Sequence, residues 1–208
     1  MNNTILALAA HPDDIEFSCG GSIQKFIKQG KKVWYVVLSP CTKSLPSDSD
    51  PLQLYQELEN AVEHLGIPKE NLIKYDFPVR DFPAYRQDIL EEFIKLKKQF
   101  HPHLVLLPNS HDIHQDHSVV REEGIRAFKN SSVLGYELPW NNLQMEQNYF
   151  VRLEEEQIKN KLAAIREYKT QATRYYNSDE FFYHLASVRG VQINTRYAET
   201  FELIRWVD

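Results

Sequence analysis

Two clusters of imidazole and carboxylate side chains lie far apart in the sequence, and each directly follows an apolar run. The first is Ala-His-Pro-Asp-Asp at residues 10–14, after the apolar residues 5–9. The second, residues 111–117, holds three histidines and two aspartates and follows the apolar residues 104–107. Neutral imidazole and carboxylate bind zinc and similar ions, and a catalytic zinc site commonly has three protein ligands. The two clusters together therefore predict a divalent metal site.

His11, Asp14 and His117 would supply two imidazoles and one carboxylate to such an ion. Asp13 and Asp14 are adjacent, and neighbouring side chains in extended backbone point in different directions, so that both cannot easily chelate one ion. One carboxylate then binds the metal and the other, Asp13, is free to act as a base. A nitrogen-and-oxygen ligand set can hold Zn²⁺, Fe²⁺, Co²⁺ or Mn²⁺, with availability deciding among them.

The elements that position these clusters alternate between strand and helix. This order predicts an α/β fold, a Rossmann-like and mostly parallel sheet with helices on both faces. We expect strands at residues 5–9, 33–38, 72–77, 104–107, 133–137, 149–153 and 198–206, and helices between the first two strands and near residues 58–65, 89–100, 119–128 and 154–168. Both clusters then follow strands at the same edge of the sheet, where open α/β folds bind ligands.

Length and composition predict one globular domain over residues 1–208. The chain is 42% hydrophobic and 25% charged, and its net charge of −5 argues against broad nucleic-acid binding, which requires a basic face. Only two cysteines occur, Cys19 and Cys41, so no disulfide framework is required and a cytoplasmic location is expected. No stretch approaches the length of a transmembrane helix, and the first ten residues are expected to form a strand rather than a signal peptide.

The two clusters also resemble a known pair of signatures. Residues 10–14 are similar to the A/P-H-P-D-D signature, and residues 114–117 to the H-x-D-H signature, of the PIG-L/LmbE-like family of zinc-dependent N-acetylglucosamine deacetylases. Further similarities fall in the family's order at residues 20–23, 61–67, 189–190 and 197–202. The resemblance implies a zinc enzyme acting on a small amino-sugar substrate, and relatives are often homo-oligomers.

The resemblance also implies a mechanism in which a water made more acidic by the ion attacks the acetamide carbonyl. Asp13 is then the base that takes the water proton and returns it to the leaving amine. His114 is expected to stabilise the tetrahedral oxyanion or to protonate the nitrogen. Asp116 is expected to lie outside the metal ligands and to fix the tautomer of His114 by a hydrogen bond to its ring.

The residues that contact the substrate are less clearly marked. Asp112 stands where some relatives have a tyrosine that helps the oxyanion, so the oxyanion donors stay open. Many relatives carry an arginine near the second helix, and Arg80 or Arg86 could replace it as an anion ligand or form a structural ion pair. Trp140 is a candidate for stacking on a pyranose ring or for core packing. The loop 40–51 is either a substrate rim or a plain surface loop.

The most direct function is removal of the N-acetyl group from an N-acetylglucosamine-type sugar or conjugate. An alternative keeps the same site and makes the chain an amidase on another N-acyl amine. A third is a non-catalytic Rossmann-like protein that binds a nucleotide or sugar through Gly20 and Gly21. This third function lacks support, because no G-x-G-x-x-G follows the first strand.

Overall fold

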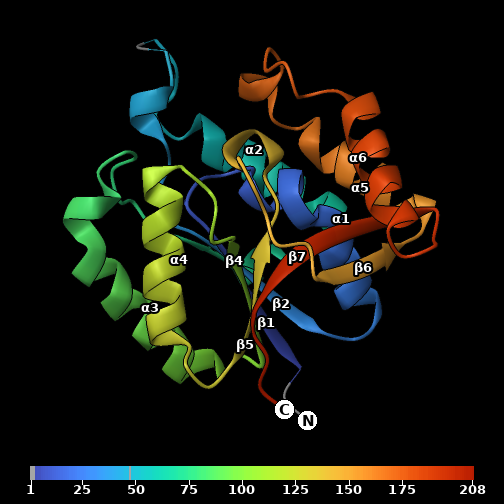
Figure 1. Ribbon diagram of the computed structural model, residues 1–208. Coiled ribbons are helices and arrows are strands. Elements are labelled where there is room, and N and C mark those ends of the chain that lie inside the picture. The colour runs from blue at the N-terminus through green and yellow to red at the C-terminus, as the bar shows by residue number, and fades with distance from the viewer. Residues whose placement is uncertain (1–2, 47) are drawn as a thin grey trace.

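A seven-stranded sheet forms the centre of the computed structural model, which describes residues 3–46 and 48–208 (Figure 1). Its order is β3-β2-β1-β4-β5-β7-β6, and the first five of these strands are parallel. β7 runs antiparallel to both of its neighbours. The strands are β1 (Thr4–Ala9), β2 (Lys32–Val37), β3 (Leu72–Lys74), β4 (Leu104–Pro108), β5 (Ser132–Tyr136), β6 (Tyr149–Leu153) and β7 (Tyr197–Arg205). The predicted mostly parallel α/β sheet is confirmed.

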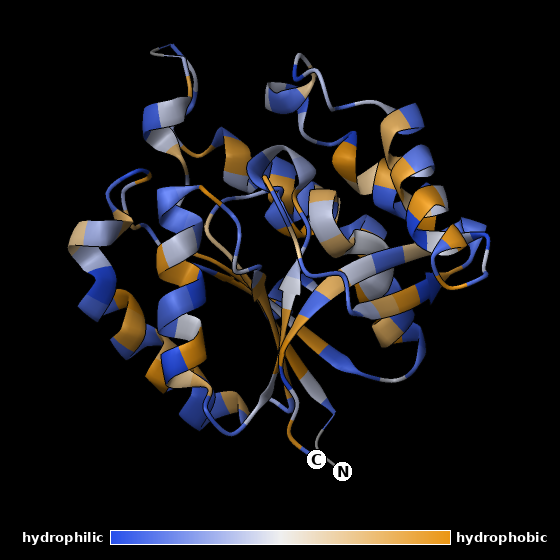
Figure 2. Cartoon of the chain, viewed as in Figure 1, coloured by the Kyte–Doolittle hydropathy of each residue, from blue (hydrophilic) through white to orange (hydrophobic). Residues whose placement is uncertain are grey.

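Helices cover both faces of this sheet. In the described part of the chain they are α1 (Asp14–Lys28), α2 (Gln53–Leu65), α3 (Arg86–Phe100), α4 (Gln115–Ala127), α5 (Glu155–Ile165) and α6 (Asp179–Val191). Figure 1 shows α3 and α4 on one face and the other four helices on the opposite face. Strand β1 is buried on both sides, with Ile5 packing into one core and Leu6 into the other. Such burial explains the continuous apolar runs, visible as orange strands in Figure 2.

The order in which the chain adds strands to the sheet reverses between β1 and β4. From β1 it adds β2 and then β3 outward, and it next crosses back to place β4 on the other side of β1. Ligands of open α/β sheets bind at such a switch point, outside the carboxyl ends of the strands. The residues after β1 and β4 are the two clusters, so the topology brings them together.

One helix lies where the sequence predicted none. Helix α6 begins after Ser178, whose hydroxyl accepts a hydrogen bond from the backbone N–H of Phe181. Its buried residues Phe182, Ala186 and Gly190 recur every four positions, which is the spacing of one helical face. Strand β3 is also shorter than expected, ending at Lys74. None of the helices in the described residues combines the length and apolarity needed to cross a membrane.

Candidate active site

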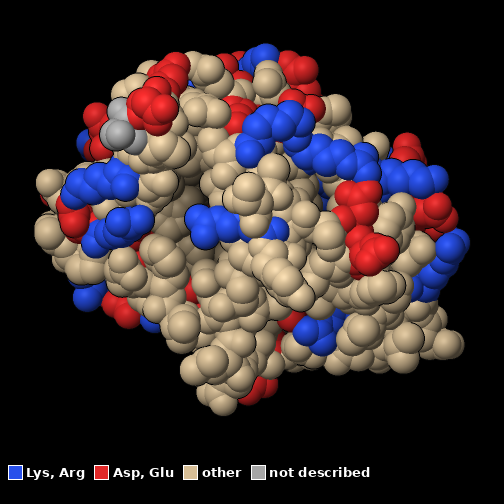
Figure 3. All heavy atoms as spheres, turned by 90° about the horizontal axis from the view of Figure 1, so that it is seen from above, with Lys and Arg blue, Asp and Glu red and all other residues tan. Residues whose placement is uncertain are grey.

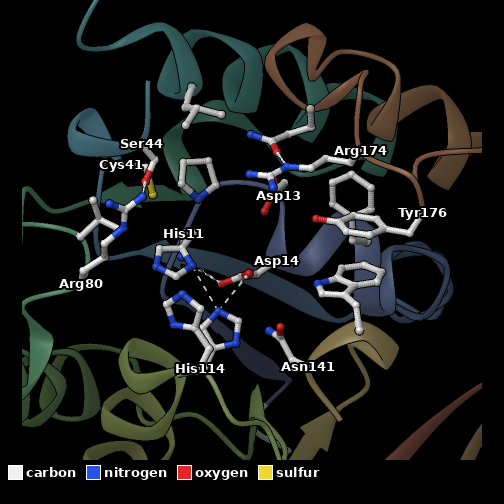
Figure 4. Close-up of a pocket in the computed structure, with 17 residues that line it drawn as sticks. His11, Asp13, Asp14, Cys41, Ser44, Arg80, His114, Asn141, Arg174 and Tyr176 are labelled. Carbon is white, nitrogen blue, oxygen red and sulfur yellow. Dashed lines mark hydrogen bonds and ion pairs between the residues drawn. The ribbon is translucent and has the colours of Figure 1, made fainter. Parts of the chain in front are cut away.

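A cavity of about 340 Å³ opens at the carboxyl edge of the sheet, within the size range of small-molecule sites. Figure 4 shows His11, Asp14 and His114 close together in it, and Figure 3 shows the hollow in the face seen from above. The lining comes from the turn after β1 and the start of α1, from the loop after β2 and the start of α2, from the loop before α3 and the start of α4, from the turn after β5, and from residues 171–176 between α5 and α6. It comprises His11, Pro12, Asp13, Asp14, Phe17, Cys41, Ser44, Leu54, Val79, Arg80, His114, His117, Trp140, Asn141, Gln171, Arg174 and Tyr176. The loop 40–51 therefore contributes Cys41 and Ser44 to the rim.

The turn between β1 and α1 separates the two adjacent aspartates. Asp13 precedes α1 with φ 88°, in the left-handed region that aspartate tolerates better than most residues. Its carbonyl accepts the first helical hydrogen bond, from the N–H of Phe17 at 2.9 Å. Asp14 instead begins the helix, and its Oδ2 accepts a hydrogen bond from the N–H of His11 at 2.9 Å. This turn therefore holds Asp14 beside His11, whereas Asp13 has no such bond.

Three side chains converge at distances that suit a metal ion. His117 Nε2 lies 3.1 Å from His11 Nδ1 and 3.4 Å from Asp14 Oδ1. Tetrahedral ligands about 2.0–2.2 Å from an ion lie roughly 3.3–3.6 Å from one another, so this donor set fits a small divalent cation. Nitrogens of His11, His114 and His117 also lie within 4.8 Å of one another, which makes His114 a further potential ligand.

The charge of Asp14 is stabilised although its side chain is buried. Burial alone raises the pKa of Asp14, but the neighbouring His117 and His11 outweigh it and lower the pKa to about 2. The same interaction acts on the histidine. Burial lowers the pKa of His117, while Asp14 and Asp112 together raise it to about 10. The positive charge of protonated His117 thus balances the carboxylates of Asp14 and Asp112, as a bound cation would.

Two carboxylates outside the ligand set fix the tautomers of the imidazoles. Asp112 Oδ2 lies 2.7 Å from His117 Nδ1, and Asp116 Oδ2 lies 3.0 Å from His11 Nε2. Each carboxylate accepts a hydrogen bond from one ring N–H, so the other ring nitrogen keeps a free lone pair for an ion. The same arrangement is general at histidine–metal sites. The carboxylate of Asp116 thus orients His11, and it is the backbone N–H of Asp116, not this carboxylate, that contacts His114. One expectation is corrected: Asp112, which is 4% exposed, lies behind His117 rather than in the cavity.

His114 is arranged as a hydrogen-bond donor. Its Nδ1 accepts a hydrogen bond from the backbone N–H of Asp116 at 3.2 Å, so that the proton of the neutral ring lies on Nε2. Burial and then the nearby His117 and His11 lower the pKa of His114 to about 4. The ring is therefore neutral at pH 7 and can offer one N–H to a ligand in the cavity.

The pKa of Asp13 is shifted in the opposite direction to that of Asp14. Burial raises the pKa of Asp13 well above its ordinary value, and the charges of Asp14 and Glu16 raise it further, against His117 and Arg174. Among the protein's own groups, the balance makes Asp13 a stronger base than an ordinary aspartate. A bound dication would act in the opposite direction and lower the pKa of Asp13.

The predicted substrate contacts divide into two groups. Arg80 and Trp140 line the cavity. Trp140 stacks on Tyr176 with the ring centroids 3.8 Å apart, so Tyr176 covers one of its faces. Arg86 is not part of the lining; its guanidinium donates to Glu123 Oε1 at 2.9 and 2.6 Å, which is the structural ion pair.

The sequence analysis did not identify the cavity residues that come from the segment 171–176. Gln171, Arg174 and Tyr176 lie between α5 and α6, in a stretch for which the sequence predicted no element and no site residue. No motif marks them, because their place at the cavity depends on tertiary contacts. Thr170, for example, is held to Glu57 of α2 by hydrogen bonds of 3.1 and 2.6 Å.

A buried ion pair supports the helix that carries Asp14. Helix α1 is broken at Cys19, with φ −130° and ψ 23°. Lys161 Nζ donates to the carbonyl of Ser18 at 2.9 Å, before the break, and Glu199 accepts from the N–H groups of Gly21 and Ser22 at 3.1 and 2.6 Å, after it. Lys161 and Glu199 are themselves 2.7 Å apart. The pair thus satisfies the backbone groups that the break exposes, and Glu199 supports the site without lining it.

Comparisons with known proteins identify relatives of this chain. Over residues 6–128 the chain matches the sequence model of PIG-L, described as GlcNAc-PI de-N-acetylase. It is 30% identical to the uncharacterized deacetylase YaiS of Escherichia coli (strain K12), over 80% of this chain and 90% of that protein. It is 26% identical to diacetylchitobiose deacetylase of Thermococcus kodakarensis, over 80% of this chain and 69% of that protein.

A solved structure shows the same fold. The N,N′-diacetylchitobiose deacetylase from Pyrococcus horikoshii aligns with a TM-score of 0.80 at 22% sequence identity, covering 96% of this chain and 83% of that one. The family model matches more than half of the chain, and a relative is 30% identical over 80% of it. The chain therefore belongs to the PIG-L family, the family of GlcNAc-PI de-N-acetylases.

Proposed function

We propose that the protein is a metal-dependent hydrolase that removes the acetyl group from an N-acetylated amino sugar or its conjugate. One observation carries this proposal: the donor atoms of His11, Asp14 and His117 converge at 3.1–3.9 Å at one cavity that Asp13 and His114 also line. Because Glu199 of β7 supports α1, we propose that residues 1–208 act as one domain.

The ligand set we propose is His11 Nδ1, Asp14 and His117 Nε2, with zinc as the ion. A divalent cation there would polarise the acetamide carbonyl as a Lewis acid and make the attacking water more acidic. Asp112 and Asp116 hold the two imidazoles in the tautomers that such binding needs.

Asp13 and His114 move the protons. Asp13 takes the proton of the attacking water and delivers it to the nitrogen as the C–N bond breaks. Its carboxylate faces the cavity, and among the residues that the structure describes no hydrogen bond competes for it. His114 donates its Nε2–H to the oxygen of the tetrahedral intermediate, because its Nδ1 is occupied by the N–H of Asp116. This route requires no tyrosine at position 112.

The substrate class follows from family membership and from two of the relatives, which are named as diacetylchitobiose deacetylases. An N-acetylglucosamine unit is therefore the acyl donor we propose. A cavity of about 340 Å³ can hold a small sugar conjugate with the acetamide at the imidazoles.

Acetate release tests the proposal. The protein is stripped of metal, reloaded with zinc and incubated with N-acetylglucosamine, diacetylchitobiose and other N-acetylglucosamine conjugates, beside a His117→Ala control. We expect release that zinc restores and that the control lacks. Release only from long-chain N-acyl amines would reassign the chain as another amidase, and metal binding without any hydrolysis would contradict the proposed reaction.

A further inference from the structure

Asn141 lines the cavity beside the candidate metal ligands, and the proposed reaction does not use its side chain. It ends the 3₁₀ turn Pro139–Asn141 after β5, where its backbone N–H donates to the carbonyl of Leu138 at 2.9 Å. Its own carbonyl accepts a hydrogen bond from the N–H of Ile113 at 3.1 Å, next to His114. The backbone of Asn141 is therefore held on both sides, and the side chain starts from a fixed position at the cavity.

The orientation of the Asn141 amide is set by Asp112. Nδ2 of Asn141 lies 3.4 Å from Asp112 Oδ2, the same oxygen that accepts from His117. An ionised carboxylate only accepts hydrogen bonds, so the amide nitrogen of Asn141 must face Asp112 and the amide oxygen must face away from it. Figure 4 shows the end of this side chain pointing into the cavity.

The amide oxygen of Asn141 receives no hydrogen bond from the part of the chain that the structure describes. Nearby amides are occupied. Asn142 Nδ2 donates to Asn109 Oδ1 at 2.9 Å, so these two asparagines bond to each other. Gln171, the other amide of the lining, accepts from Arg174 at 3.1 Å. Asn141 Oδ1 is therefore a neutral acceptor that is available to a ligand in the cavity.

An acetamide needs such an acceptor. It has a carbonyl and an N–H, and both lose their water when the ligand enters the cavity. In the proposed function the carbonyl is bound by the metal ion and by the Nε2–H of His114. The nearby carboxylates have other partners, because Asp14 binds the ion and Asp13 takes the proton of the attacking water. A neutral amide oxygen can accept the N–H without competing for that proton.

We propose that Asn141 Oδ1 accepts a hydrogen bond from the N–H of the scissile amide, and that the site thereby selects N-acetyl amides over O-acetyl esters. The inference rests on the proposed function and deepens it. Figure 4 shows Asp13 and Asn141 on opposite sides of Asp14. With its hydrogen held by Asn141, the nitrogen turns its developing lone pair toward Asp13.

The hydrogen bond to Asn141 lasts through the reaction. The water oxygen bonds to the carbonyl carbon, and the nitrogen gains the proton that Asp13 took from the water. The C–N bond then breaks and its electron pair stays with the nitrogen. The nitrogen has kept its original hydrogen, so it leaves as a primary amine, with acetic acid as the other product.

Two probes that differ at one atom test this inference. They are the methyl glycoside of N-acetylglucosamine and the methyl glycoside of 2-O-acetylglucose, in which an ester oxygen replaces the N–H. Acetate release by the zinc-loaded protein gives kcat/KM for each probe. Calorimetry measures the affinity for each probe in an Asp13→Asn background, where hydrolysis is slow.

Two variants remove the acceptor. Asn141→Ala shortens the side chain, and Asn141→Leu keeps most of its volume. Asn130→Ala is the matched control, because Asn130 is exposed after α4 and is not part of the lining. Zinc affinity is measured for every protein by competition with a chelator.

We expect the Asp13→Asn protein to bind the N-acetyl probe about tenfold more tightly than the O-acetyl probe. Both Asn141 variants should abolish this preference and lower kcat/KM for the N-acetyl probe about 10- to 100-fold, with a change of less than about threefold for the ester. Zinc affinity should stay at the parent value, because Asp112 still accepts from His117. The control should alter none of these quantities.

The outcomes separate this inference from the proposed function. Acetate release from the N-acetyl probe that both Asn141 variants leave unchanged would keep the deacetylase and overturn the acceptor. Equal losses for the two probes, together with weaker zinc binding, would show that Asn141 acts only through Asp112 and would also overturn it. An affinity preference that depends on Asn141, without acetate release from either probe, would keep the acceptor and contradict deacetylation. Equal affinity of the Asp13→Asn protein for the two probes, or none for either, would overturn the inference.

Discussion

Asp112 Oδ2 lies 2.7 Å from His117 Nδ1, and both side chains are buried. The other carboxylate oxygen of Asp112 accepts a hydrogen bond from the N–H of His114 at 2.9 Å. One aspartate therefore orients an imidazole of the candidate ligand set and fixes the backbone that starts α4.

Replacement of Asp112 tests this orientation. In Asp112→Asn, the amide oxygen can still accept the hydrogen bond from the N–H of His114. The amide NH₂ group then faces the proton-bearing Nδ1 of His117, and two donors cannot form a hydrogen bond. We expect metal affinity to fall about 10- to 100-fold, measured by competition with a chelator. Asp88→Asn on α3, where the carboxylate is exposed, is the matched control. An unchanged metal affinity in Asp112→Asn would contradict the role of Asp112.

The buried ion pair of Lys161 and Glu199 predicts an effect on stability. In Lys161→Met, Glu199 loses a buried partner 2.7 Å away and the carbonyl of Ser18 loses its donor. Removing one member of a buried pair lowers the free energy of unfolding by about 3–5 kcal/mol. Denaturant unfolding measures this loss. Lys159 is exposed on the same helix, so Lys159→Met is the matched control. It should change the free energy of unfolding by less than about 1 kcal/mol.

A pH dependence of stability follows from Glu16. Burial raises the pKa of Glu16 to about 7, although Tyr35 donates a hydrogen bond of 2.9 Å to its Oε2. Since the folded protein holds this proton more tightly than the unfolded chain, the stabilisation is present below the unfolded pKa of about 4.5 and is lost as the pH rises to about 7. The loss is at most about 3 kcal/mol.

Glu16→Gln removes that titration. We expect the variant to show a flatter dependence of unfolding free energy on pH between about 4.5 and 7 than the parent protein. Urea unfolding at several pH values measures both curves on metal-free protein. Parallel curves for variant and parent would show that Glu16 keeps an ordinary pKa in the fold.

The sequence predicted the sheet well because its pattern is local. A run such as Leu104 to Leu107 is apolar on both faces, and it is a buried parallel strand in the structure. Gly66 ends α2 with φ 77°, the left-handed conformation that glycine adopts easily. Helix α6 escaped prediction because its buried face is narrow and includes Ala186 and Gly190, which give little hydrophobic contrast.

The site was predictable only where one short motif carries the chemistry. His11 and His117 are recognisable from their motifs, but the partner of each imidazole depends on the fold. Asp116 is one residue from His117 in sequence, yet its carboxylate contacts His11, 105 residues away. Contacts such as that of Arg174 with the cavity arise from packing between distant elements, and sequence spacing carries no information about them.

Asp13 gives the sharpest test of the chemistry, because its substitution can leave the fold and the ligands intact. Asparagine tolerates the left-handed conformation that Asp13 adopts at φ 88°, so Asp13→Asn keeps the turn between β1 and α1. The amide cannot accept the water proton, and loss of a general base lowers the rate about 10²–10⁴-fold. We expect kcat to fall by this factor while zinc content and KM stay near those of the parent protein, measured by acetate release and metal analysis of the same samples. The control is Asp76→Asn, at an exposed aspartate after β3. Full activity in a zinc-loaded Asp13→Asn protein would require another residue as the base.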